Sequence, residues 1–172
     1  MIRKADARDA SVLAAVGMEV WLTTYLREGV TPLFADYALA EFTTQTSLEA
    51  MADPNRAIWV SECASGIDGY VMVSSNAKPP VDACSSLEIM TLYVRPNQQA
   101  LGRGKLLLKR ALDHFTANGG ESAWLKVNAE NSRAIAFYHR LHFRNVGSTW
   151  FEISDQAFEN FVMQIDLSPS AG

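Results

Sequence analysis

Hydrophobic positions change their spacing along the chain from strand-like to helical and back several times. Residues 1–5 read as a short first strand. Residues 6–26 carry side chains at helical spacing, and Asp9 or Ser11 is expected to cap the helix. The side chains that this spacing places on one face are Val12, Ala15, Val16, Glu19 and Val20. The pattern therefore predicts a strand followed by a long helix.

The middle of the chain reads as helices followed by a hairpin. Residues 31–52 predict one or two further helices, which end at Asp53-Pro54 because the residue before a proline disfavours helix. Residues 57–64 and 67–75 are two apolar runs joined by Ser65-Gly66, which is typical of a β-hairpin. A polar loop with two prolines follows.

The second half alternates strands and helices. The apolar positions and the turn residues predict these segments: a strand over 87–95 that stops before Pro96, a helix ending at Asn118-Gly119-Gly120, a strand over 122–129, a helix over 131–141, and strands over 143–153 and 161–167. In the first of these helices Leu108, Ala111, Leu112 and Phe115 share one face. This order implies a mixed sheet with helices on both faces.

Composition places the chain among ordinary globular proteins. Its 172 residues are 48% hydrophobic and 20% charged, which suits one domain over residues 1–167 and a disordered tail over 168–172. The net charge of −4 argues against nucleic acid as a partner. No signal peptide or membrane segment is seen, so we expect a cytoplasmic protein. Cys63 and Cys84 have no zinc-ligand spacing, and we expect free thiols and no metal.

Two glycines and several cations at a helix start suggest a phosphate site. The stretch is QQALGRGKLLLKRAL, residues 98–112. A nucleotide P-loop would need glycine at position 99, which is Gln99, and a hydroxyl at Leu106. A dinucleotide fingerprint would need a third glycine at Leu107. Both of these readings fail.

The spacing Gln99-x-x-Gly102-x-Gly104, directly after a strand, resembles the pyrophosphate loop of the GNAT superfamily of N-acetyltransferases, which use acetyl-CoA. The resemblance extends over residues 87–143, through LEIMTLYVRP before the loop and NAENSRAIAFYHRLHF after it. It implies a fold of the α/β (mixed α+β) class. The central sheet is expected to be mixed but mostly antiparallel, with about seven strands flanked by about four helices.

The resemblance also assigns residues to the cofactor. It implies that the backbone of Leu92, Tyr93 and Val94 pairs with the pantetheine arm, and that the amides near Gly102 hold the pyrophosphate. The full set expected at acetyl-CoA is Leu92, Tyr93, Val94, Gln99, Ala100, Leu101, Gly102, Arg103, Gly104, Lys105, Asn131, Arg133 and Phe137. Asn131 also suits a helix cap, and the two roles are compatible.

Two side chains are expected to handle protons. Tyr138, in AIAFYHRLHF, matches the tyrosine that serves the family as general acid towards the leaving thiolate, although His142 stands where the family has glycine. Glu88 stands where some family members keep a general base, and a charge that only attracts a cationic substrate is the alternative. An acceptor ammonium with a pKa of ~10.4 needs such a base, or a water relay to one, at neutral pH.

The acceptor is the least defined part of the reaction. Trp21, Tyr25, Phe34 and Glu28 lie where the family forms its acceptor site, beside Tyr37, and aromatic core packing is the alternative for the rings. We expect a primary amine, such as a polyamine or another small amine. A protein N-terminus or lysine is an alternative acceptor, and a non-catalytic acyl-CoA-binding regulator is an alternative of another class. Because the edge strands of such sheets often pair between subunits in this family, we also expect a homodimer.

Overall fold

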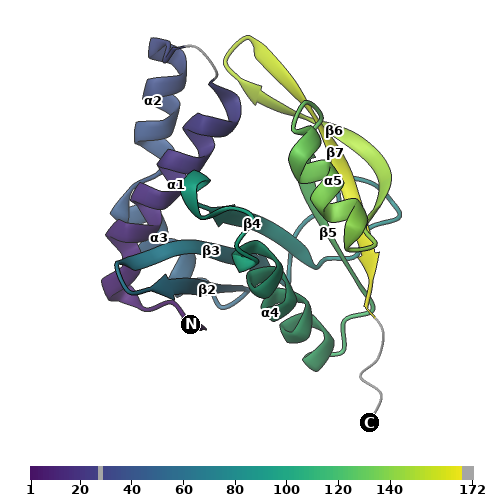
Figure 1. The fold of residues 1–172 in the computed structure, drawn as a ribbon. Coiled ribbons are helices and arrows are strands. Elements are labelled where there is room, and N and C mark those ends of the chain that lie inside the picture. The colour runs from purple at the N-terminus through teal and green to yellow at the C-terminus, as the bar shows by residue number, and fades with distance from the viewer. Residues whose placement is uncertain (27–28, 168–172) are drawn as a thin grey trace. The chain divides into compact units, whose positions relative to one another are not determined.

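The computed structural model describes residues 1–26 and 29–167. One sheet has the strand order β1-β2-β3-β4-β5-β7-β6 (Figure 1). β4 and β5 are parallel, whereas the β1–β2, β5–β7 and β6–β7 pairs are antiparallel. The strands are β1 (Ile2–Lys4), β2 (Arg56–Cys63), β3 (Gly66–Ser74), β4 (Glu88–Val94), β5 (Ser122–Asn128), β6 (Arg144–Ile153) and β7 (Gln156–Asp166). The mixed, mostly antiparallel sheet of seven strands is confirmed.

Five α-helices are present in the described residues, one more than expected, because residues 31–52 form two helices. They are α1 (Ala10–Tyr25), α2 (Pro32–Glu41), α3 (Thr44–Ala52), α4 (Arg103–Ala117) and α5 (Ser132–Arg140). Two short 3-10 turns, Ala7–Asp9 and Pro96–Gln98, precede α1 and follow β4. None of the helices within 1–26 and 29–167 is long and apolar enough to cross a bilayer.

The chain divides into two compact units that are interleaved in sequence. The first contains Met1–Val73 and Thr91–Ala111, and the second contains Ser74–Met90 and the residues from Leu112 onward. β4 and α4 each contribute residues to both units. One continuous domain over 1–167 stays a prediction, and the predicted tail at 168–172 lies outside the described residues.

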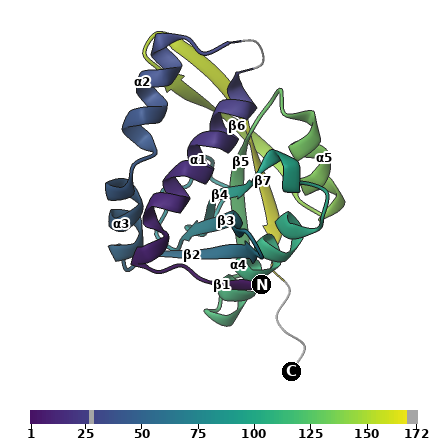
Figure 2. The ribbon, with the colours of Figure 1, turned by 60° about the vertical axis from the view of Figure 1, so that its left-hand side comes forward.

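The core of the first unit lies between its strands and the helices α1 and α3. Leu13, Val16 and Val20 of α1 and Ala50 of α3 pack with Ile58, Val60 and Tyr70. α1 also packs against α2 (Figure 2). The predicted helix face was partly wrong, because Val12 is 37% exposed and Ala15 is exposed. Leu13 is buried instead, so the apolar stripe is rotated by one residue from the expected one.

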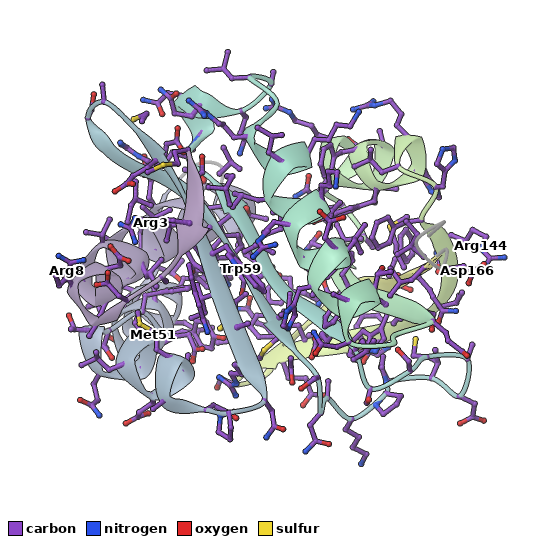
Figure 3. All side chains as sticks on the ribbon, turned by 90° about the horizontal axis from the view of Figure 1, so that it is seen from below. Arg3, Arg8, Met51, Trp59, Arg144 and Asp166 are labelled. Carbon is purple, nitrogen blue, oxygen red and sulfur yellow. The ribbon has the colours of Figure 1, made fainter. Side chains whose placement is uncertain are left out.

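The opposite face of these strands meets α4. Side chains alternate between the faces of a strand, so Trp59 points away from its neighbours Ile58 and Val60. The Arg110 guanidinium of α4 lies 5.4 Å from the centre of the Trp59 ring. Figure 3 shows Trp59 on the side of α4 and Met51 on the side of α1 and α3. Helices therefore cover both faces of this part of the sheet, as predicted.

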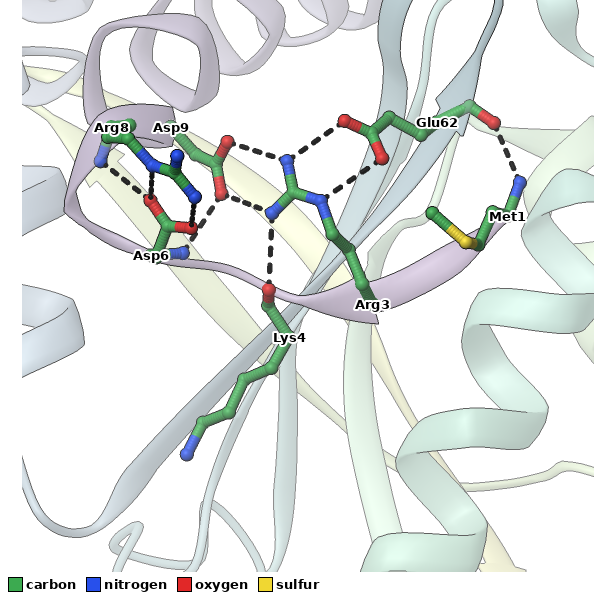
Figure 4. A network of polar contacts seen from close by, with 7 residues as sticks. All are labelled: Met1, Arg3, Lys4, Asp6, Arg8, Asp9 and Glu62. Carbon is green, nitrogen blue, oxygen red and sulfur yellow. Dashed lines mark hydrogen bonds and ion pairs between the residues drawn. The ribbon is translucent and has the colours of Figure 1, made fainter.

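A network of ion pairs holds the start of the chain (Figure 4). Arg3 of β1 donates to both oxygens of Asp9, at 2.7 and 2.9 Å, and to both oxygens of Glu62. Its guanidinium lowers the pKa of the Asp9 carboxyl and of the Glu62 carboxyl. Asp9 is the residue before α1, as predicted, but its side chain does not cap α1 because Arg3 and the Asp6 amide hold it. Ser11 lies inside α1.

The second unit contains the β5-β7-β6 strands and α5, and its most buried side chains are those of Phe115, Trp124, Leu125, Phe143, Val162 and Met163. β7 begins at Gln156, five residues before the predicted start, because Phe158 and Asn160 already pair with β6. An exposed ion pair of 2.7 Å joins Arg144 of β6 to Asp166 of β7, and both residues are labelled in Figure 3.

Candidate active site

The connection between β4 and α4 adopts a conformation that suits an anion. Gly102 has φ +79° and Ala100 has φ +70°, so two residues of this short segment are left-handed. The carbonyl of Gly102 accepts the first helical hydrogen bond, from the amide of Leu106 at 3.1 Å. The first amides of a helix have no carbonyl partner within the helix, and the helix dipole favours negative charge there. The loop that the sequence predicted therefore has the backbone of an anion-binding turn.

Side chains fix this connection at its two ends. The Gln99 amide donates to the Val94 carbonyl at 3.0 Å, so Gln99 ties the loop to the last residue of β4. Arg103 Nε lies 3.3 Å from Asp68 Oδ2, on β3. Lys105 is exposed and Gly104 is partly buried within the first turn of α4.

The three β4 residues assigned to pantetheine differ in burial. Val94 is buried, whereas Leu92 and Tyr93 are half-buried, and the Tyr93 ring meets the Tyr70 ring edge-on with centroids 5.7 Å apart. The amide of Arg95 donates to the Asp68 carbonyl at 3.0 Å, which holds the end of β4 against β3. Pairing of the β4 backbone with the cofactor stays a prediction.

Glu88 is buried at the beginning of β4 and is paired with a lysine. It lies opposite Trp124 in the parallel pairing of β4 with β5. Only 8% of the residue is exposed, and Lys126 Nζ of β5 lies 3.3 Å from its Oε1. The Lys126 ammonium also lies 5.8 Å from the centre of the Trp124 ring. A buried carboxylate is therefore present at the position predicted for a general base, with a cation beside it that the sequence did not indicate.

Tyr138 lies at the end of α5, where two backbone hydrogen bonds fix its position. The amide of Phe143 donates to the Tyr138 carbonyl at 3.1 Å, and the amide of His142 donates to the His139 carbonyl at 3.0 Å. Together with the left-handed φ of +69° at His142, these bonds form a Schellman motif. The rings of Tyr138 and Phe143 pack with centroids 5.5 Å apart. Burial raises the pKa of the Tyr138 hydroxyl above its ordinary value.

The residues expected near Tyr138 have visible structural roles. Asn131 Oδ1 accepts from the Ala134 amide at 3.1 Å, so its predicted role as a helix cap is confirmed. Phe137 packs edge-on against Tyr138 with centroids 5.2 Å apart, and Arg133 is exposed on the first turn of α5. Contact of these three residues with a cofactor stays a prediction.

The aromatic residues assigned to the acceptor form a cluster around Trp21. The Trp21 ring lies 4.9 Å from Tyr25, 5.8 Å from Phe34 and 4.9 Å from Tyr37, measured between centroids. Trp21 and Phe34 are 4% and 8% exposed, so core packing between α1 and α2 accounts for these two residues. Tyr25 is half-buried. Glu28 lies outside the described residues.

The structure thus gathers the predicted residues in two groups. The first unit holds the β4–α4 loop, Leu92–Val94 and the Trp21 cluster. The second holds Glu88, Asn131, Arg133, Phe137 and Tyr138. Among residues 1–26 and 29–167 no group of three or more His, Cys, Asp or Glu side chains could hold a metal ion.

The model of the Acetyltransferase (GNAT) family matches residues 18–143. The chain belongs to this family. The match runs from within α1 to the end of the α5 turn at Phe143, so the β4–α4 loop, Glu88 and Tyr138 all lie inside it. β1 and the β6–β7 hairpin lie outside the matched residues. The chain is therefore an acetyltransferase of the GNAT type.

Relatives and solved structures agree with the GNAT assignment. An uncharacterized N-acetyltransferase of Mycobacterium tuberculosis is 26% identical over 159 residues, which cover 92% of this chain and 98% of that protein. Mycothiol acetyltransferase of Beutenbergia cavernae is 40% identical over 79 residues, which are 46% of this chain and 26% of that protein. The crystal structure of the PaiA N-acetyltransferase of Thermoplasma acidophilum in complex with coenzyme A has a TM-score of 0.72 at 18% identity, with 96% of this chain and 98% of that chain covered.

Two charged residues of this GNAT chain escaped the sequence analysis. Asp68 and Lys126 were passed over as members of ordinary strands, yet each forms an ion pair with a residue of the predicted site, Arg103 or Glu88. A signal was present for Asp68, which interrupts an apolar strand beside Gly69. No comparable signal marked Lys126, because a lysine in an alternating strand is normally a solvent-facing residue.

Proposed function

We propose that the chain transfers the acetyl group of acetyl-CoA to a primary amine, such as a polyamine or another small amine. The observation that carries the proposal is the β4–α4 turn, where left-handed Gly102 presents the first amides of α4 to an anion. The amine nitrogen attacks the thioester carbon and the carbon–sulfur bond breaks. The ammonium gives its proton to Glu88, directly or through a water, and coenzyme A leaves as a thiolate that takes a proton from solvent. The mycothiol acetyltransferase match supports acetyl transfer but covers only 46% of this chain, so it does not select the acceptor.

Tyr138 is the residue that we assign to the leaving thiolate. Burial raises the pKa of its hydroxyl above the ordinary ~10, which already exceeds the ~8.5 of a typical thiol. Complete proton transfer to the thiolate is therefore uphill at this site. Tyr138 stays protonated at neutral pH and stabilises the thiolate by donating a hydrogen bond as charge develops on sulfur.

Glu88 is the group that we assign to the acceptor proton, directly or through a water. In the alternative role, Glu88 would only attract a cationic substrate, and its ion pair with Lys126 weakens that alternative. A carboxylate with an ammonium 3.3 Å away has little net charge at a distance, so its attraction for a cationic amine is weak. The pair therefore argues against the alternative in which Glu88 only attracts a cationic substrate.

Binding and turnover separate this proposal from a non-catalytic acyl-CoA-binding protein. Acetyl-CoA should raise the melting temperature because it binds the folded state. Gly104→Val should abolish that shift, since a branched side chain would stand where a phosphate oxygen approaches, and Gly104 lies within α4 where valine can adopt the backbone conformation. A normal shift in a folded variant would contradict the pyrophosphate assignment.

Thiol release from acetyl-CoA with a panel of amines then measures catalysis. The panel contains polyamines, small monoamines, a peptide with a free N-terminus and a peptide with an acetylated N-terminus and one lysine. We expect release with a small amine. Release with the peptides alone would assign a protein acceptor, and a thermal shift without release from any amine would assign a binding protein.

A further inference from the structure

Asp68 is a buried carboxylate to which the proposed reaction gives no role. It lies on β3 with only 2% of the residue exposed. Neither of its carboxylate oxygens accepts a hydrogen bond within the described part of the chain. Burying a carboxylate is costly unless a charge or hydrogen bonds compensate it. The Arg103 guanidinium, with Nε 3.3 Å from Oδ2, supplies the compensating charge.

Asp68 contacts both ends of the segment that joins β4 to α4. Its backbone carbonyl accepts from the Arg95 amide at 3.0 Å, just after β4, and its carboxylate pairs with Arg103, the first residue of α4. The neighbouring Gly69 allows this approach, because a Cβ there would lie 2.6 Å from the Tyr93 carbonyl oxygen. A single residue of β3 therefore contacts the chain both directly after β4 and at the first residue of α4.

The contact with Asp68 uses one particular part of the Arg103 side chain. Nε faces the carboxylate, and a guanidinium carries four further N–H groups on its two terminal nitrogens. The side chain is 28% exposed, so it reaches from the buried carboxylate towards solvent. The ion pair with the buried carboxylate restricts where the guanidinium can lie, and a guanidinium that is already restricted loses less conformational freedom when it binds a phosphate.

We propose that Asp68 is a positioning residue for the pyrophosphate site: it clamps the two ends of the β4–α4 segment and orients Arg103 towards the cofactor phosphates. The inference rests on the proposed function, because it takes the anion to be the pyrophosphate of coenzyme A. It assigns Asp68 an effect on donors that carry a pyrophosphate and none on donors that lack one. A merely structural residue would affect both kinds of donor alike.

The test compares acetyl-CoA with S-acetylpantetheine, which lacks the pyrophosphate, in the full chain. Asp68→Asn keeps the shape of the side chain and removes its charge. We expect its KM for acetyl-CoA to rise about tenfold, with kcat unchanged. A tenfold change corresponds to the loss of one charge-assisted contact between Arg103 and the phosphate. The kcat/KM with S-acetylpantetheine should stay at the wild-type value. An equal loss with both donors, or no loss with either, would overturn the proposal.

A matched control and a second variant keep the test independent of folding. Asp9→Asn also removes a buried carboxylate that pairs with an arginine, Arg3, and it should leave the ratio of the two donors unchanged (Figure 4). Because Asp68 is proposed to act through Arg103, Asp68→Asn should add nothing further in an Arg103→Met background. If the effects of Asp68→Asn and Arg103→Met on kcat/KM for acetyl-CoA add in the double variant, the proposal that Asp68 acts through Arg103 is overturned. This comparison remains valid if Asp68→Asn alone folds poorly.

Failure of the inference and failure of the proposed function give different results. If wild-type protein releases no thiol with any amine, the proposed acetyl transfer fails. The clamp is then tested by calorimetric binding of coenzyme A and of pantetheine to the wild type and to Asp68→Asn. A selective loss of coenzyme A affinity supports Asp68 as a positioning residue, and absence of coenzyme A binding by the wild type overturns both proposals.

Discussion

The turn after α5 carries a backbone conformation that its residue does not favour. His142 has φ +69°, in the left-handed region, at the position that follows the last helical turn in a Schellman motif. The motif is repeated at the end of α4. There Gly120 donates to the Phe115 carbonyl at 2.9 Å, Gly119 donates to the Thr116 carbonyl at 3.0 Å, and Gly119 has φ +78°. The chain therefore contains the same turn twice, once with glycine and once with histidine.

This repetition allows the cost of His142 to be worked out. A left-handed conformation costs a residue with a Cβ about 1–2 kcal/mol. Glycine avoids that cost but loses more backbone entropy on folding, by about 0.5–1 kcal/mol. His142→Gly should therefore stabilise the protein by about 0.5–1 kcal/mol. For a chain of this size the change corresponds to an increase of about 1–4 °C in melting temperature.

Thermal unfolding of three variants checks the calculation. His142→Gly should raise the melting temperature. Gly119→Ala should lower it, because a Cβ at Gly119 meets nothing within 4 Å and only the backbone conformation is penalised. Ala136→Gly, at an exposed position in the middle of α5, should lower the melting temperature through a destabilisation of about 1 kcal/mol, the ordinary cost of glycine in a helix interior. If His142→Gly is neutral or destabilising while Gly119→Ala behaves as expected, conformational strain at His142 is refuted.

Four further predictions concern the titrating groups. Tyr138→Phe keeps the packed ring and removes one hydrogen-bond donor to the developing thiolate. It should lower kcat by about 10²–10³, less for donors with a more acidic thiol, in assays with a series of thioesters. Because burial raises the pKa of Tyr138, its ionisation should cause no loss of kcat/KM below about pH 10 in a pH–rate profile. Glu88→Gln should lower kcat at neutral pH and recover as pH rises, whereas an increase in KM alone would leave Glu88 an attracting charge. Burial also raises the pKa of Tyr70, and that of Tyr37 to about 12. The unfolded chain ionises first, so the free energy of unfolding should begin to fall as pH rises above about 10, the unfolded pKa of both groups, in denaturant titrations.

The sequence was sufficient for the order of elements because the apolar spacing and the turn residues agree with each other. α4 is the clearest case, since its apolar face and its Asn118-Gly119-Gly120 ending both appear in the structure. The predicted face of α1 was displaced because most positions of this helix are apolar or small, so the pattern does not select one stripe. The early start of β7 was missed because Gln156 to Asn160 contains polar residues that the pairing with β6 tolerates.

The turn at Gly102 and the need for glycine there could both be predicted from the sequence. A left-handed residue before a helix start needs glycine, and the structure gives Gly102 that conformation. Ala100 is also left-handed, but because it is not a glycine the sequence did not predict this conformation. His142 is a similar case: the family pattern marked the position as unusual, and the backbone angle explains why glycine suits it. Strain of this kind is visible only when the backbone is known.

The ion pairs of the two buried carboxylates, Asp68 and Glu88, show which features the sequence alone could not predict. Alternation along β3 and β4 can tell which side chains share a face, but it cannot tell that a carboxylate on that face is buried or which cation compensates it. Asp68 pairs with Arg103 and Glu88 pairs with Lys126, and in both cases the cation belongs to an element much later in the chain. A buried carboxylate tolerates loss of its cation poorly, so each pair couples two positions that the sequence presents as independent. That coupling, more than either residue alone, is what the Asp68 and Arg103 double variant measures.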